Sequence, residues 1–212
     1  QIMAENASLA SVQRHGCRAL SLVAAENGQG AVIDSGGLDV TIASMQRHPA
    51  NVAVVEQGCA TIRNVLAGSE QEAEAEAVAA RCEHVSKSGA VDVLLRAMAN
   101  HPSESAVQEQ GCAALANLTG GCAGFAHAAA VCAHARQAGA VGAVLRAMRG
   151  HPGSPSVAEQ GCAALGALGS ALGEGDIDDP IVEMVEAGAI EAIVGAMRAH
   201  GGALCVGAHG SA

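Results

Sequence analysis

The stretch Glu104-Ser-Ala-Val-Gln-Glu-Gln-Gly-Cys-Ala-Ala-Leu-Ala-Asn-Leu-Thr-Gly120 decides the fold, because partial copies of it recur along the chain. Its Gly-Cys pair occurs at Gly16-Cys17, Gly58-Cys59, Gly111-Cys112 and Gly161-Cys162. The four cysteines are separated by 42, 53 and 50 residues. Self-similarity at a period of this size indicates a repeat protein whose units stack on one another.

Two further markers keep the same register. A methionine is followed three residues later by histidine at Met45/His48, Met98/His101, Met148/His151 and Met197/His200. A glycine precedes each of these methionine-containing segments, at Gly36, Gly89, Gly139 and Gly188. Both markers are spaced by 53, 50 and 49 residues, so chance repetition does not explain them.

The apolar residues of each unit recur with helical spacing. Val91, Leu94, Leu95 and Met98 follow an i, i+3, i+4, i+7 pattern, which predicts an amphipathic helix. Three of these helices meet a proline directly after the histidine, and the histidine suits the negative end of the helix dipole. After the proline, Ser105 with Gln108 and Ser156 with Glu159 have the form of a capping box.

The composition also favours helices. The chain contains one phenylalanine and neither tryptophan nor tyrosine, yet 50% of its residues are apolar. A core of small side chains requires closely spaced elements, which packed helices provide. The fold class that we predict from composition and period is all-α, a solenoid of stacked helical repeats.

The expected organisation is one unit over residues 1–212. A truncated repeat contributes its last helix over 1–25, and complete repeats follow over 26–68, 69–121 and 122–173. A partial repeat spans 174–200, and a Gly-rich, frayed tail spans 201–212. The acidic run that begins at Glu70 is interpreted as an extended helix or loop with a solvated face.

The charge balance bears on the partners. The formal net charge is −10, Lys87 is the sole lysine, and no cluster of basic residues with interleaved aromatic residues occurs. Nucleic acid is therefore not an expected partner, since binding it requires a basic face. The sequence contains no uninterrupted apolar run of about 18 residues, so we expect no membrane span. We also see no signal peptide at its start.

The eight cysteines predict reduced thiols rather than disulfides. Cys17, Cys59, Cys112 and Cys162 occupy one repeat position, so they are expected to form a row inside the core. A reducing, cytoplasmic location follows from this interpretation. The densest Cys/His group, Cys122 to His134, lacks metal-ligand spacing, so we expect no metal site, no cofactor and no catalytic residues.

The order of short helix, glycine turn, second helix and long third helix carrying Gly111-Cys-Ala-Ala-Leu-Ala-Asn-Leu118 resembles the armadillo repeat family. The resemblance implies a right-handed α-solenoid of armadillo-type three-helix repeats. It also implies that the third helices line a concave groove for extended peptides, and that Asn64 and Asn117 pair with the backbone of the partner. Leu22 and Ala167 stand at the same position in the other copies. The tryptophans of the nuclear-import receptors are absent too, because their positions hold Arg18, Ala60, Ala113 and Ala163.

Function is thus predicted to be recognition of protein rather than catalysis. The first hypothesis is a non-enzymatic scaffold that binds an extended or helical segment, with basic residues favoured by Glu56, Glu109 and Glu159. The alternatives are a structural subunit held in a larger assembly through its uncapped ends and convex face, and a regulatory module of a longer protein. The candidate binding residues are Gln57, Ala60, Asn64, Gln110, Ala113, Asn117, Gln160 and Ala163.

Overall fold

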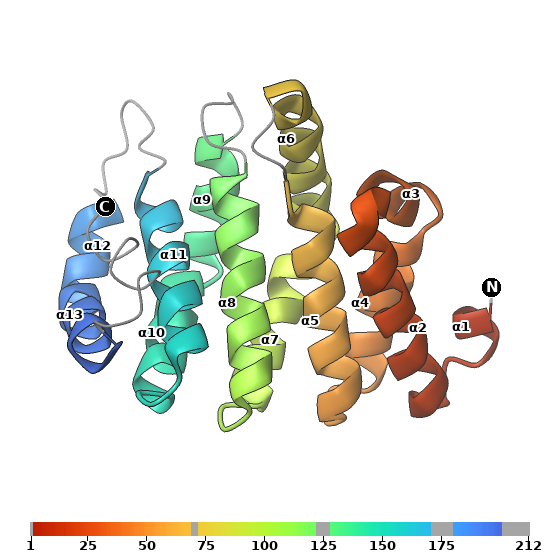
Figure 1. Ribbon diagram of the computed structural model, residues 1–212, viewed down its shortest axis with the longest axis horizontal. Helices are drawn as coiled ribbons and strands as arrows, with labels where there is room; N and C mark the ends of the chain where they lie inside the picture. Colours follow the sequence, from red (N-terminus) through yellow and green to blue (C-terminus); the bar gives the residue numbers. More distant parts are fainter. Residues whose placement is uncertain (1, 69–71, 122–127, 171–179, 201–212) are drawn as a thin grey trace.

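The computed structural model describes residues 2–68, 72–121, 128–170 and 180–200, and every regular element in these ranges is a helix (Figure 1). The expected all-helical class is confirmed for them. The bounds are α1 Ile2–Glu5, α2 Ala10–Val23, η1 Ala24–Gly28, α3 Gln29–Asp34, α4 Gly37–Arg47, α5 Val52–Leu66, α6 Glu72–Lys87, α7 Ala90–Asn100, α8 Ser105–Gly120, α9 Ala128–Gln137, α10 Ala140–Gly150, α11 Pro155–Ser170, α12 Pro180–Glu186 and α13 Ala189–His200.

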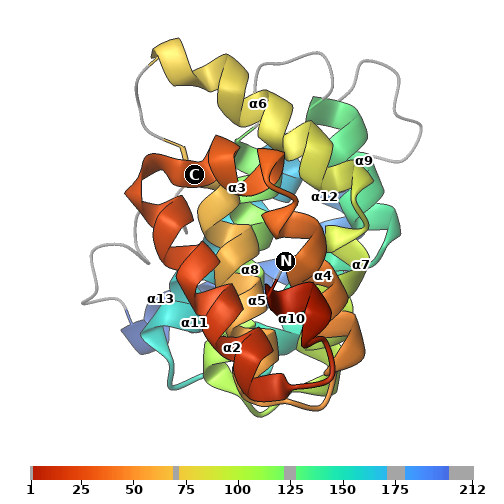
Figure 2. The same cartoon turned by 90° about the vertical axis from the view of Figure 1, so that its right-hand side faces the viewer.

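The helices follow one another in sets of three. Each set has a first helix (α3, α6, α9), a second helix (α4, α7, α10) and a longer third helix (α5, α8, α11). The third helices, with α2, form one layer, and the second helices form another beside it, as the view along the stack shows (Figure 2). Neighbouring third helices make the most extensive contacts between elements, so this layer is continuous from α2 to α11.

A left-handed glycine precedes each second helix. Gly36, Gly89, Gly139 and Gly188 have φ values of 73°, 80°, 93° and 85°. A residue with a Cβ rarely adopts these φ values, so glycine is required at the corner between the first and second helix. This is the physical reason for the glycine marker in the sequence.

The row of cysteines lies in the core, as the sequence predicts. Cys17, Cys59 and Cys112 are fully buried, and Cys162 is 1% exposed. All four are free thiols. Cys59, Cys112 and Cys162 lie in apolar clusters with leucine and valine side chains, where each acts as a small apolar residue. Cys17 also contacts the hydroxyl groups of Thr41 and Ser44.

The glycine beside each cysteine gives room to a methionine. A Cβ on Gly111 would lie 2.7 Å from Cγ of Met98, and a Cβ on Gly58 would lie 2.5 Å from Cγ of Met45. Gly161 faces Met148 in the same way. The second helix therefore packs its methionine directly on the backbone of the third helix, and the two sequence markers form one contact.

The first helix pair departs from the expected start. The sequence predicts only a last helix over 1–25, but the short α1 precedes it and places Met3 against Gly16. The amide of Gln13 donates to the carbonyl oxygens of Met3 and Asn6, at 2.8 and 2.9 Å. Thus α1 takes the place that the end of a second helix takes in the later sets.

The predicted capping boxes are wrong, because Ser105 already lies inside α8 and Ser156 inside α11. Glu104 is the N-cap of α8, without a side-chain hydrogen bond to the helix. Gln108 is instead 2% exposed and donates to the carbonyl oxygens of Met98 and His101. Its side chain ties the third helix to the end of the second, which satisfies a carbonyl that the helix end leaves open.

Parts of the predicted organisation lie outside the described residues. These are the tail over 201–212, most of the loop before α12, and Cys122 with its neighbours up to His127. The acidic run is in helix from Glu72 onward, as the first part of α6.

Candidate functional site: the face formed by the third helices

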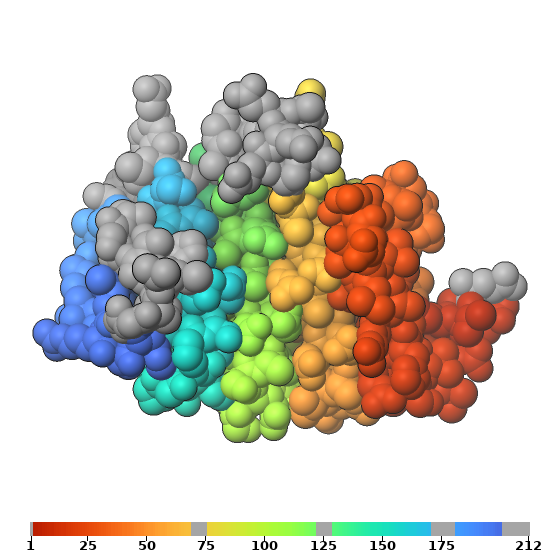
Figure 3. Space-filling view, viewed as in Figure 1, coloured from red at the N-terminus to blue at the C-terminus, as the bar shows by residue number. Residues whose placement is uncertain are grey.

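The outward side chains of α2, α5, α8 and α11 form what we call the third-helix face. Figure 3 shows these helices as four adjacent columns across one side of the molecule. All eight binding residues predicted from the sequence lie on α5, α8 or α11. The fold therefore brings them to one layer, although the sequence separates the first and last by more than 100 residues.

The predicted binding residues differ in exposure. Gln57, Ala60, Gln110, Asn117, Gln160 and Ala163 are half-buried. Asn64 is 8% exposed and Ala113 is 5% exposed, so neither offers much surface. The alanines occupy the same repeat position, one residue after the cysteine. Their small side chains project little from the third helices.

Asn64 and Asn117 connect neighbouring third helices. Nδ2 of Asn117 donates to the carbonyl oxygen of Arg63 on α5, at 3.1 Å. Nδ2 of Asn64 donates to both the carbonyl oxygen and Oγ of Ser21 on α2, at 2.9 Å each. Arg63 donates in turn to Oδ1 of Asn64, at 2.8 Å. In this structure both asparagines hold the third helices together.

A row of glutamates crosses the same face. Glu56, Glu109 and Glu159 each lie three residues before the buried cysteine, and each is half-buried. None of them forms an ion pair with a described residue. Nε2 of Gln57 donates to Glu56 and Nε2 of Gln110 donates to Glu109, both at 3.3 Å.

The charge changes sign at α2. Arg14 takes the position that the glutamates hold on the other third helices, and Arg18 lies one turn further along. Both side chains are exposed. Arg14 contacts the ring of His15, with 2.8 Å between Nη2 and Nε2. The third-helix face therefore carries one glutamate on each of α5, α8 and α11, with Arg63 also on α5, and it is basic over α2.

The sequence predicts the repeated histidines only as helix-end residues, but they also link neighbouring sets of helices. Nε2 of His101 donates to the carbonyl oxygen of Pro49, at 2.7 Å, and Nε2 of His151 donates to that of Pro102, at 2.9 Å. His48 and His200 make the equivalent bonds to Ala7 and Pro152. Each histidine ends a second helix, as expected, but it also joins that helix to the preceding set.

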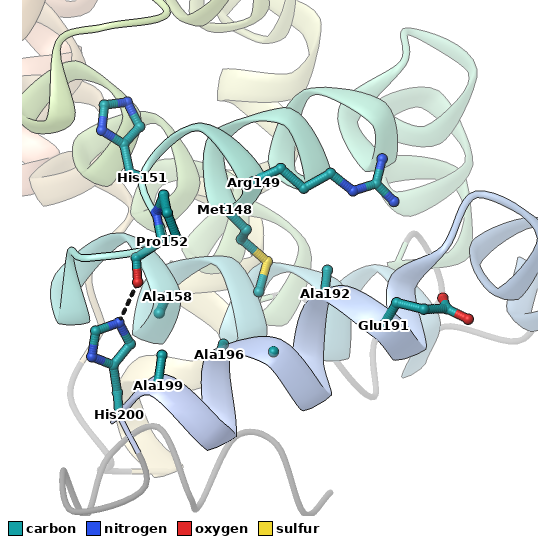
Figure 4. Close-up of a pocket in the computed structure, with 11 residues that line it drawn as sticks. Met148, Arg149, His151, Pro152, Ala158, Glu191, Ala192, Ala196, Ala199 and His200 are labelled. Carbon is teal, nitrogen blue, oxygen red and sulfur yellow. Dashed lines mark hydrogen bonds between the residues drawn. The ribbon is translucent and has the colours of Figure 1, made fainter.

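Cavities occur between successive second helices. One of about 200 Å³ lies between α10 and α13, with Met148 and Ala196 in its wall (Figure 4). Another of about 160 Å³ lies between α4 and α7. The bond from His200 to Pro152 closes one side of the larger cavity (Figure 4). Small residues on α13 account for this space.

The buried thiols are poor nucleophiles. Desolvation by burial raises the pKa of Cys59 and of Cys112 from 9.0 to about 12, and that of Cys17 to about 11. The thiolate, which is the reactive form, is therefore scarce at neutral pH. Among the described residues, no three His, Cys, Asp or Glu side chains are placed to hold a metal ion.

Within the described ranges, none of the helices combines the length and the apolar character that crossing a bilayer requires.

Comparison with known proteins gives one partial likeness. The chain is 31% identical over 86 residues to "Protein aardvark" of Dictyostelium discoideum, a match that covers 41% of this chain and 11% of that protein. No family model matches the chain, and no solved structure matches it. The match covers too small a part of that protein for its activity to be assigned to this chain.

Proposed function

We propose that the chain is an armadillo-type, right-handed α-solenoid that acts as a non-enzymatic scaffold for protein interactions, and that it binds a segment of a partner protein on the third-helix face. The succession of three-helix sets supports the fold, because the same contacts between methionine and glycine, and between histidine and the preceding carbonyl, return in each set. Stacked sets of helices present extended surfaces of the kind that repeat proteins use for binding.

The observation that carries the proposal is the row of Glu56, Glu109 and Glu159. Three half-buried carboxylates on three successive third helices have no cationic partner among the described residues. Carboxylates placed at regular intervals on one surface favour a partner with basic side chains. A polyanion such as nucleic acid would meet repulsion there.

A second candidate function is a structural role through the two ends. Ile2, Leu9 and Leu22 are 71%, 50% and 58% exposed at one end, and Val182 and Ile190 are each 52% exposed at the other. Exposed apolar residues grouped in this way are typical of interaction surfaces. A regulatory module within a longer protein is the third candidate, consistent with the small share of the Dictyostelium protein that matches. The free buried thiols support a reducing, cytoplasmic location for all three.

The proposal is tested by locating a bound peptide. The ¹⁵N-labelled chain is titrated with a lysine-containing proline-rich peptide, and the backbone amide signals are followed by NMR. We expect the signals of α5, α8 and α11 to shift, and those of α4, α7 and α10 to change little. Binding confined to the apolar ends, or self-association without peptide binding, would favour the structural role. Shifts confined to the second helices would contradict the proposed surface.

A further inference from the structure

The charges on the third-helix face form one row with a defined spacing. Arg14, Glu56, Glu109 and Glu159 occupy the same repeat position on α2, α5, α8 and α11. Helices that pack side by side have axes about 8–10 Å apart. The row therefore presents three negative charges and then one positive charge, at intervals of about one helix spacing.

One buried acceptor beside this row also lacks a hydrogen-bond donor. Oε1 of Gln110 is buried and accepts no hydrogen bond, while the Nε2 of the same residue is used by Glu109. A buried acceptor without a donor is costly, by about 1–3 kcal/mol in general. This oxygen is shielded from solvent, so a donor brought by a partner would reach the half-buried carboxylate of Glu109 instead.

The interval of the row matches one peptide conformation. A polyproline II helix rises about 3.1 Å per residue and has three residues per turn, so every third side chain points the same way at intervals of about 9 Å. Side chains on one side of a β-strand recur about every 7 Å, which is too short for the row. Ala60, Ala113 and Ala163 beside the glutamates have small side chains, so a peptide backbone can approach the helices closely.

We propose that the partner segment is an extended, polyproline II peptide with basic residues at every third position, which crosses the third helices and places one basic side chain on each of Glu56, Glu109 and Glu159. This inference rests on the proposed function and names the chemistry of its ligand. Arg14 ends the series, because a fourth basic residue over α2 would meet a like charge.

The test uses three nonapeptides that contain only proline and lysine or glutamate. The first has lysine at positions 1, 4 and 7, the second has lysine at positions 1, 2 and 3, and the third has glutamate at positions 1, 4 and 7. Their Kd values for the full chain are measured by fluorescence anisotropy at low ionic strength. We expect the spaced lysine peptide to bind about five-fold tighter than the clustered one, with a difference that shrinks as salt is added.

Two variants report on the register. Glu109→Gln is expected to weaken binding of the spaced peptide about two- to five-fold, the size of one exposed ion pair, and to leave the clustered peptide unchanged. Asp92→Asn removes one negative charge from α7 in the same set and serves as the matched control. Arg14→Glu is expected to tighten binding of a dodecapeptide with lysine at positions 1, 4, 7 and 10 by a similar factor.

The outcomes separate the two levels of the proposal. If both lysine peptides bind equally and Glu109→Gln affects them alike, the proposed function stands but the register is overturned. If none of the peptides binds, or if the glutamate peptide binds best, both the register and the preference for basic partners are overturned. Thermal unfolding of each variant confirms that a lost affinity is not a lost fold.

Discussion

At the scale of single residues, the packing of each three-helix set depends on where side chains are missing. Gly111 lies within a helix, where glycine ordinarily costs stability relative to alanine. Here the absent Cβ is replaced by the side chain of Met98, whose Sδ would lie 2.8 Å from it. The close approach of the second and third helix is therefore obtained at the expense of helix propensity.

Two glycine substitutions are expected to have opposite effects. Gly111→Ala places a Cβ against Met98 and should lower the free energy of unfolding by about 1–3 kcal/mol, the usual cost of overpacking. Gly166→Ala, in the exposed part of α11 with nothing within 4 Å of the new Cβ, should raise it by about 0.5–1 kcal/mol. Urea unfolding monitored by circular dichroism measures both.

A double-mutant cycle identifies the cause. Met98→Ala is itself destabilising, but Gly111→Ala should cost less in its presence because the overlapping atoms are gone. An unchanged cost of Gly111→Ala in the Met98→Ala background would assign the effect to something other than this contact.

At the scale of helices, amide side chains set the alignment of the third-helix layer. Asn117 links α8 to α5, and Asn64 links α5 to α2. Thr61 adds a bond from α5 to the carbonyl oxygen of Cys17, at 2.9 Å. The α11 helix has Ala167 at the asparagine position, so it lacks this bond to α8.

Asn117→Ala should lower the free energy of unfolding by about 1–2 kcal/mol, because a partly buried carbonyl oxygen on α5 loses its donor. Gln110→Met, a half-buried residue on the same helix, should be nearly neutral or stabilising, because it removes an acceptor that has no partner. Chemical denaturation of the two variants gives the comparison. Equal destabilisation by both would mean that the bond between the helices contributes nothing specific.

The sequence predicts the helices better than it predicts the bonds between them. Periodic apolar residues and the glycine before each second helix determine local structure, so they can be read directly. The short α1 has no such pattern, although the interval from Met3 to Gly16 equals that from Met98 to Gly111 and could have revealed it. Gln108 fits a capping box by local spacing, but tertiary contacts use its amide elsewhere.

The candidate site shows the same division. The third-helix periodicity places the predicted residues on one layer, yet it assigns Asn64 to a partner when its amide is used by Ser21. Bonds between residues 43 or 54 positions apart have no local signature. The glutamate row, in contrast, repeats with the period of the chain, so the amino-acid sequence alone reveals it.

At the scale of the whole molecule, each set of helices is joined mainly to its neighbours. The histidine-to-carbonyl bonds connect the end of a second helix to the loop after the preceding second helix, and the amide bonds connect consecutive third helices. The buried cysteines run through the whole stack, from α2 to α11. A change that acts on all of these thiols together should therefore affect the entire fold.

Raising the pH provides such a change. The pKa values of Cys17, Cys59 and Cys112 are raised by burial from 9.0 to about 11, 12 and 12. Below pH 9 the thiols are protonated in both the folded and the unfolded chain, so their contribution to the free energy of unfolding is fully present. Above pH 9 the unfolded chain releases protons first, and stability falls until the pH passes the folded pKa values.

The loss is expected to approach about 1.4 kcal/mol per thiol for each pH unit above 9. The chain has no tyrosine, and its five other cysteines add to the loss where burial raises their pKa in the same way, as it does for Cys162. Urea unfolding at pH 8 and pH 10 measures the loss. Cys112→Ala should reduce the pH dependence of the free energy of unfolding by about the contribution of one thiol. A dependence that this substitution leaves unchanged would mean that the buried cysteine row does not govern alkaline unfolding.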